Sequence, residues 1–187
     1  MSHARNVFDK FYEVRGKGPN GVETLTYPVA ASQTIKKGDL LKFSASGQTV
    51  EQALALPGAN STASADSGGS VALVGMALES IKTESSGQEA ITERSKIRVA
   101  IFGNVNQFAL RIYDATQGSS EAQDLTSGGT YQFKRWRGAD AGTWWYALST
   151  AGTGEFVFLK PCTTVEPTET YAPVWLRANT AEANQAS

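Results

Sequence analysis

The fold is decided by three apolar runs between residues 34 and 103: Thr34-Ile35-Lys36-Lys37-Gly38-Asp39-Leu40-Leu41-Lys42-Phe43, Val71-Ala72-Leu73-Val74-Gly75-Met76-Ala77-Leu78-Glu79-Ser80-Ile81 and Ser95-Lys96-Ile97-Arg98-Val99-Ala100-Ile101-Phe102-Gly103. They are rich in valine, isoleucine and leucine and are separated by glycine-containing segments, which is typical of short β-strands joined by turns. In the third run, Ile97, Val99 and Ile101 recur at every second position, so we expect them to face the core. Gly75 interrupts the second run, where we expect a β-bulge or a sharp bend.

Strand-like runs continue on both sides of this region. Residues 22–29 alternate in the manner of a strand, and residues 40–45 with 48–53 have the pattern of a hairpin. A strand at 107–113 is expected to pair back after the turn at Gly103-Asn104, and an antiparallel β-meander is predicted from the last three runs, 130–136, 143–149 and 155–160. So many short strands with few helical stretches indicate an all-β barrel or sandwich.

The length and composition are those of one folded core with extended ends. The 187 residues are near the usual size of a single domain, and the hydrophobic fraction of 41% argues against wholesale disorder. Breaker residues at 16–21 separate an N-terminal arm, residues 1–21, from a core at 22–160 that includes the tryptophan-rich meander 130–160. Proline spacing predicts an extended C-terminal arm and tail over 161–187.

The charge balance excludes some classes of partner. A formal net charge of −1 gives no overall attraction to nucleic acid or to an anionic membrane, since both favour a strongly basic surface. We therefore expect neither as a partner. The N-terminus lacks the apolar stretch of a secretory signal, and no window approaches the roughly 18 apolar residues of a membrane span, so synthesis in a cytoplasm is expected.

The residues that usually carry catalysis are scarce. The single cysteine, Cys162, follows Pro161 at the end of an apolar run, which favours a buried structural thiol over a reactive one. The single histidine, His3, lies close to the N-terminus. Because these two residues cannot form a nucleophile–base pair or a metal site, we expect no catalytic residues, no metal, no cofactor and no enzymatic activity.

Binding is the remaining function, and the sequence offers two sets of candidate residues. The N-terminal arm carries a cluster of large apolar residues that is too short to fold alone and needs a surface to lie on, either a partner or the chain's own core. Aromatic residues elsewhere are candidates for exposed contacts, because adjacent tryptophans in a strand point to opposite faces. The two sets are Phe8, Phe11, Tyr12 and Val14 in the arm, and Trp144, Trp145 and Trp175 elsewhere.

Four segments together have the pattern of a known family. They are Val29-Ala30-Ala31, then Ile35-Lys36-Lys37-Gly38-Asp39-Leu40-Leu41, then Val74-Gly75-Met76-Ala77-Leu78-Glu79, and finally Ile97-Arg98-Val99-Ala100-Ile101-Phe102-Gly103-Asn104. Their order and spacing resemble those of the head decoration, or cement, proteins of tailed bacteriophages. The resemblance covers about 70 of the 187 residues.

The resemblance implies a fold and a function. The fold would be a small β-barrel or β-tulip-like core, here with an added β-meander and long arms. The function would be that of a non-enzymatic virion protein that binds the major capsid protein on the exterior of an assembled capsid, as a homotrimer, and stabilises the shell. The alternative is a phage fibre or tail β-module that binds a carbohydrate or a host receptor through exposed tryptophans.

Overall fold

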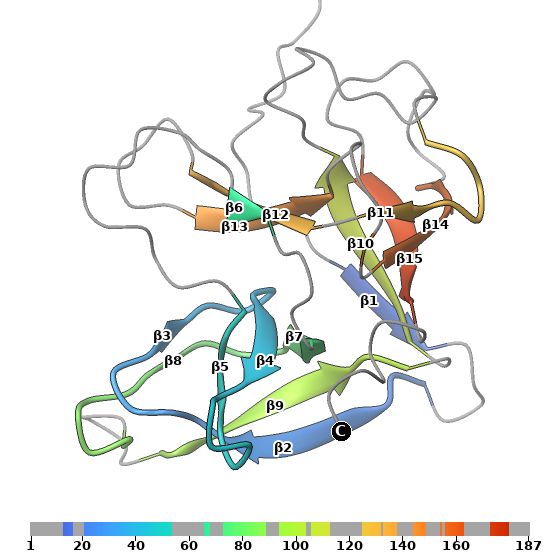
Figure 1. Ribbon diagram of the computed structural model, residues 1–187. Coiled ribbons are helices and arrows are strands. Elements are labelled where there is room, and N and C mark those ends of the chain that lie inside the picture. Colours follow the sequence, from blue (N-terminus) through green and yellow to red (C-terminus); the bar gives the residue numbers. More distant parts are fainter. Residues whose placement is uncertain are drawn as a thin grey trace, which may run out of the picture.

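The chain is an all-β protein (Figure 1). The computed structural model describes residues 13–16, 21–53, 66–67, 73–88, 94–103, 106–112, 125–131, 133–137, 144–148, 154, 156–162 and 173–179, with the backbone only at 66–67, 111, 134–137 and 144–147. Within these ranges the chain forms strands, turns and bends, and no helix. The prediction of an all-β fold is confirmed.

The strands form two main sheets and a separate two-stranded sheet. The large sheet has the order β11-β14-β15-β10-β13-β12-β6, and β1 also pairs with β10. Its strands are β1 (Glu13–Gly16), β6 (Asp66–Ser67), β10 (Asn106–Ile112), β11 (Thr130–Tyr131), β12 (Phe133–Arg137), β13 (Trp144–Leu148), β14 (Phe156–Pro161) and β15 (Pro173–Ala178). The small sheet has the order β2-β9-β7-β4-β5, and β3 pairs with β8 apart from it. These strands are β2 (Thr24–Pro28), β3 (Thr34–Ile35), β4 (Leu40–Phe43), β5 (Val50–Gln52), β7 (Leu73–Ala77), β8 (Ile81–Lys82) and β9 (Lys96–Ile101).

The three apolar runs at residues 34–43, 71–81 and 95–103 meet in the small sheet. They supply β4, β7 and β9, which are direct neighbours and pair antiparallel. The expected hairpin is confirmed, because β4 pairs antiparallel with β5. Ile97 and Val99 are fully buried as predicted, whereas Ile101 at the end of β9 is half-buried.

A β-bulge lies beside Gly75, as expected. Leu41 is opposite Gly75 but the next residue of β4, Lys42, is opposite Leu73, so β7 contains one extra residue. All residues of β7 are buried because Leu73 and Met76 belong to one apolar cluster and Val74 and Ala77 to another. Gly75 is required because β9 passes very close to it.

We predict that Gly75→Ala destabilises the protein by about 1–3 kcal/mol, measured as the free energy of unfolding in urea. The new Cβ would lie 2.1 Å from the carbonyl oxygen of Ala100 and 2.7 Å from Cγ1 of Val99. Gly103→Ala is the matched control, because nothing lies within 4 Å of a Cβ there. Equal stability of the two variants would contradict the close approach of β9 to β7.

The turn before β4 explains the Lys36-Lys37-Gly38-Asp39 segment. The amide of Asp39 donates to the carbonyl of Lys36, and Gly38 has a φ of 86°, as the third residue of a type II turn requires. The Asp39 side chain is buried. Its Oδ2 accepts hydrogen bonds from the amide of Lys36 at 2.8 Å and from Nε2 of Gln52 at 2.9 Å. The carboxylate therefore ties the turn to β5.

The main core lies between the two sheets. The small sheet contributes Leu40, Leu73, Met76 and Ala100 to this core. Most of the other core residues come from the large sheet, and they include Phe108, Leu110, Ile112, Leu125, Tyr131, Phe133, Leu148, Phe156, Phe158, Val174 and Leu176. The molecule is thus a two-layer β structure whose sheets bury one face each against the other.

A second core lies on the other face of the small sheet. It contains Val29, Ile35, Leu41, Val50, Val74, Ala77, Ile81, Ile97 and Val99, and it includes residues of β3 and β8. The chain after β2 reaches β5 here, since Val29 forms a parallel bridge with Val50 and the amide of Ala30 donates to the Val50 carbonyl at 2.9 Å. The small sheet therefore curls around this core.

The expected pairing of the strand after Gly103-Asn104 with the strand before it is not observed. β10 does not pair with β9 but enters the large sheet, where it pairs antiparallel with β1 and β15 and parallel with β13. Phe102 lies at the crossing and packs edge-on against Phe108 and Phe156, with ring centroids 4.5 Å and 5.3 Å away. The partly buried Phe102 ring thus packs against the main core at the point where the chain leaves the small sheet.

Asn106 joins the two sheets at this crossing. Its side chain is buried, and Nδ2 donates to the carbonyls of Glu23 at 2.8 Å and Ile101 at 2.9 Å. Oδ1 accepts from the amide of Glu23 at 2.9 Å. The buried side-chain amide thus lies between Glu23, directly before β2, and Ile101 at the end of β9, and it bonds backbone groups of both.

We predict that Asn106→Ala lowers the free energy of unfolding by about 1–3 kcal/mol, because the Glu23 amide and the Ile101 carbonyl lose the buried side-chain amide that bonds them. Urea denaturation measures the change. Gln88→Ala, at an exposed position, serves as the control. If the urea-denaturation curve of the Asn106 variant overlays that of the parent protein, this amide does not hold the sheets together.

Three expectations about the outer parts of the chain are wrong. Residues 13–16 of the supposed N-terminal arm form β1 in the large sheet, and residues 173–178 of the supposed C-terminal arm form β15 between β14 and β10. Within residues 130–160, β12 and β13 pair antiparallel as the meander required, but β14 does not continue it and pairs with β11 and β15 instead. The apolar alternation of Val174 and Leu176 buries β15 in the main core.

Candidate partner-binding surfaces

The predicted arm residues are only partly placed. Phe8, Phe11 and Tyr12 lie outside the described residues. Val14 is in β1, opposite Phe108, and packs against the main core as a partly buried side chain. Val14 is therefore not available to a partner, and the candidate attachment segment is reduced to residues 1–12.

The three candidate tryptophans have different outcomes. Trp144 and Trp145 are in β13, and the backbone of Trp145 is opposite Trp136 of β12, but their side chains lie outside the described residues. Trp175 is 5% exposed, so the expectation that it is an exposed contact is wrong. It is buried because β15 is an internal strand of the large sheet and because its ring is covered from outside.

Arg15 covers the ring of Trp175 on the outer face of the large sheet. The guanidinium carbon lies 3.8 Å from the ring centroid, and Nε donates to Oε1 of Gln107 at 2.6 Å. Such stacking contributes about 0.5–2 kcal/mol and keeps a polar group over an apolar ring. These contacts hold β1 against the large sheet.

Cys162 belongs to the same outer face and is buried beside Trp175 and Ala109. Burial and, less strongly, the nearby carboxylate of Glu13 raise the pKa of the thiol to about 11, although Arg15 and Lys160 oppose the rise. The thiol is protonated at neutral pH, which agrees with the predicted structural role.

We predict that Cys162 in the folded protein reacts with iodoacetamide at pH 8 at least about tenfold more slowly than in the urea-unfolded chain. A raised pKa lowers the thiolate fraction at this pH, and the rate should rise as the pH passes from 9 toward 11. Mass spectrometry follows the reaction cleanly because the chain has one cysteine. Equal rates in the folded and unfolded states would mean that the thiol is accessible and ionised.

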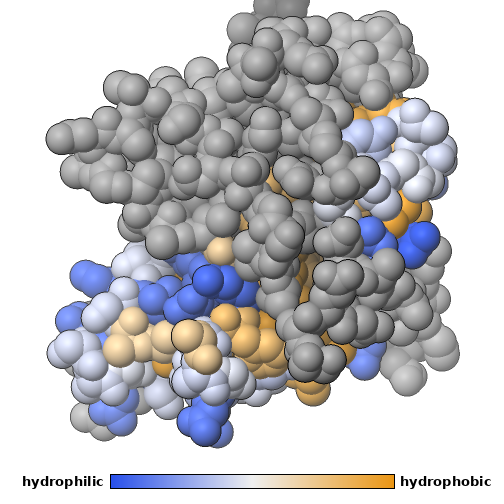
Figure 2. All heavy atoms as spheres, in the orientation of Figure 1, coloured by the Kyte–Doolittle hydropathy of each residue, from blue (hydrophilic) through white to orange (hydrophobic). Residues whose placement is uncertain are grey.

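An apolar patch is exposed on the small sheet. We call Leu25, Tyr27 and Phe43 the β2–β4 patch. Leu25 is 49% exposed and Phe43 is 42% exposed, and the rings of Tyr27 and Phe43 meet edge-on with centroids 5.6 Å apart. Figure 2 shows apolar residues at the surface of the part of the molecule that Figure 1 draws as the small sheet. The alternation of residues 22–29 puts Leu25 and Tyr27 on one face of the strand, but it does not indicate that this face is exposed to solvent.

The strand that carries Leu25 is an edge. Among the described residues β2 pairs only with β9, and it runs along the border of the small sheet in Figure 1. The Ile101 amide donates to the Glu23 carbonyl, and the Val29 amide donates to the Ser95 carbonyl. Since antiparallel pairs alternate, the odd-numbered residues of β2 bond to β9 and the even-numbered ones point their backbone groups outward.

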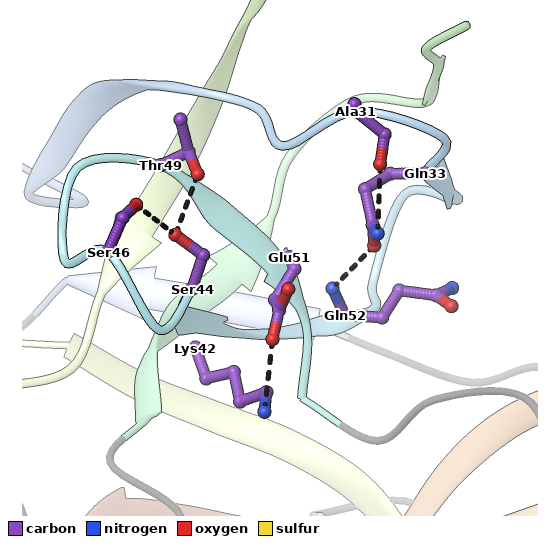
Figure 3. A network of polar contacts seen from close by, with 8 residues as sticks. All are labelled: Ala31, Gln33, Lys42, Ser44, Ser46, Thr49, Glu51 and Gln52. Carbon is purple, nitrogen blue, oxygen red and sulfur yellow. Dashed lines mark hydrogen bonds and ion pairs between the residues drawn. The ribbon is translucent and has the colours of Figure 1, made fainter. Parts of the chain in front are cut away.

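The hairpin next to the patch is held by polar contacts (Figure 3). Ser44 Oγ is 2.9 Å from Ser46 Oγ and 2.8 Å from Thr49 Oγ1, which closes the end of the β4–β5 hairpin. Lys42 Nζ lies 3.0 Å from Glu51 Oε1 across the strands. The ion pair is partly exposed and contributes at most about 1 kcal/mol. These contacts fix the strand that presents Phe43.

The described residues offer no group of histidine, cysteine, aspartate and glutamate side chains that could hold a metal ion. They also contain no helix of the length and apolar character that a membrane crossing needs. No family model matches the sequence, and neither a curated protein nor a solved structure matches the chain. The arguments for function therefore rest on the fold and its surfaces.

Proposed function

We propose that the chain is a virion structural protein that binds the major capsid protein on the outside of an assembled bacteriophage head and stabilises it. One observation supports the proposal. The segments that resemble those of head decoration proteins, although spread over about 70 residues, supply β4, β7 and β9, which are adjacent in one sheet. Their apolar residues Leu41, Val74 and Val99 share one core.

The small sheet is, in this proposal, the counterpart of the barrel or tulip-like core of that family. β2 and β5 stand at the two ends of the strand order, yet the bridge between Val29 and Val50 brings these ends together. The large sheet is then an addition that presents β1 and the segment before it.

The proposed attachment segment is residues 1–12. It leads into β1, which Arg15 fixes to the large sheet through Trp175 and Gln107. Burying Phe8, Phe11 and Tyr12 on a capsid would contribute about 1.5–3 kcal/mol each before ordering costs. A homotrimer would present three such segments to a symmetric shell, and multivalency would strengthen the attachment.

The test is co-sedimentation with undecorated heads assembled from the major capsid protein of the phage that would carry this chain. Full-length protein should sediment with the heads. Deleting residues 1–12 should abolish co-sedimentation while leaving the melting temperature almost unchanged, because β1 is retained.

A matched full-length variant in which Phe8, Phe11 and Tyr12 are replaced by serine separates apolar contacts from chain length, and it should also fail to sediment. Failure of the full-length protein to bind heads would overturn the proposed function. Parental binding by the truncated protein would keep the function but move attachment away from this segment.

The alternative, a fibre or tail module that binds a carbohydrate or receptor, depended on exposed tryptophans. Trp175 is buried under Arg15 and cannot stack on a sugar ring. The alternative is left with Trp144 and Trp145, and no contact of the described residues favours it.

A further inference from the structure

The outer edge of β2 has the properties of a strand-accepting site. Thr24 and Thr26 are exposed and point their backbone N–H and C=O groups away from β9. No charged residue lies within β2, although natural edge strands are usually protected by lysine, bulges or proline. The accessible edge ends at Pro28, whose even-numbered position also faces outward and which has no N–H to donate.

The two faces beside this edge differ in chemistry. One face carries the β2–β4 patch. On the other face Thr26 is opposite Arg98 and Pro28 is opposite Lys96, and both cations are exposed. Among the described residues no acidic side chain pairs with either cation. A strand added at this edge would therefore contact apolar side chains on one face and positive charge on the other.

We propose that the edge of β2 binds an extended peptide segment that alternates apolar and acidic residues. Its backbone would pair with Thr24 and Thr26, its apolar residues would lie beside Leu25, and its carboxylates would lie on the face of Lys96 and Arg98. The small size of the threonine side chains leaves the long cations free to reach across β2.

Charge decides between this occupant and a second copy of the chain. If β2 paired with β2 of another copy, Thr24 and Thr26 would face each other, and no carboxylate would meet Arg98 or Lys96. Like-charged faces of the two copies would instead lie side by side. The site therefore fits an acidic amphipathic strand better than it fits itself. The inference does not rest on the capsid proposal, because it is tested without heads.

The experiment uses a synthetic heptapeptide that alternates valine and glutamate, with binding followed by calorimetry and by amide chemical shifts. The peptide should bind and shift amides of β2, and the affinity should fall as salt rises. Two control peptides should bind at least about tenfold more weakly: a valine–lysine peptide, and a valine–glutamate peptide N-methylated at alternate amides.

Variants of the protein complete the test. Thr26→Pro removes an outward N–H without removing a bond to β9 and should abolish binding, whereas Thr26→Val should bind like the parent. Leu25→Lys, at an exposed site, should also abolish binding and keeps the test valid if the proline variant is destabilised. Arg98→Gln should weaken binding and reduce its dependence on salt.

Three results would overturn the inference. The first is equal binding of the valine–glutamate and valine–lysine peptides, and the second is parental binding by Leu25→Lys. The third is sedimentation showing a dimer that Leu25→Lys dissociates, together with no peptide binding, which would assign the edge to a second copy of the chain.

Discussion

The arrangement of the two layers depends on one buried amide. Asn106 places its side chain in the ladder between Glu23 and Ile101, where a backbone group of a neighbouring strand would otherwise be needed. Both its donor and its acceptor are used, and no apolar side chain of this size could replace it. This polar contact lies beside the point where the chain crosses at Phe102, and it ties the start of β10 to the small sheet, while the apolar core packs the two sheets against each other.

The two sheets differ in how far the apolar side chains on their outer surfaces are covered. On the large sheet a tryptophan is closed off by a stacked arginine and a cysteine is kept protonated by burial. On the small sheet a leucine and a phenylalanine are exposed beside an edge that pairs with no other strand of the described residues. Large exposed apolar side chains are informative when they gather in one place.

Strand alternation predicted more of the local structure than of the topology. The period of two placed Ile97 and Val99 in the core, and Gly75 marked a bulge, because both depend on near neighbours in the chain. The pairing of β10 with β1 and with β15 could not be predicted, since it joins segments more than 60 residues apart, such as Phe108 with Leu176. Exposure of Leu25 was also beyond the pattern, because alternation specifies a face and not what covers it.

The central position of β15 has a consequence for how the protein folds during synthesis. All five strands of the small sheet lie between residues 24 and 101, so this sheet can form while the rest is still being made. β10, by contrast, keeps one side unpaired until residues 173–176 have left the ribosome. Pairing across such distances is slow and leaves strand edges accessible in the meantime. The nascent chain therefore passes through a stage in which the small sheet is complete and the large sheet is not. Aggregation is expected chiefly at that stage.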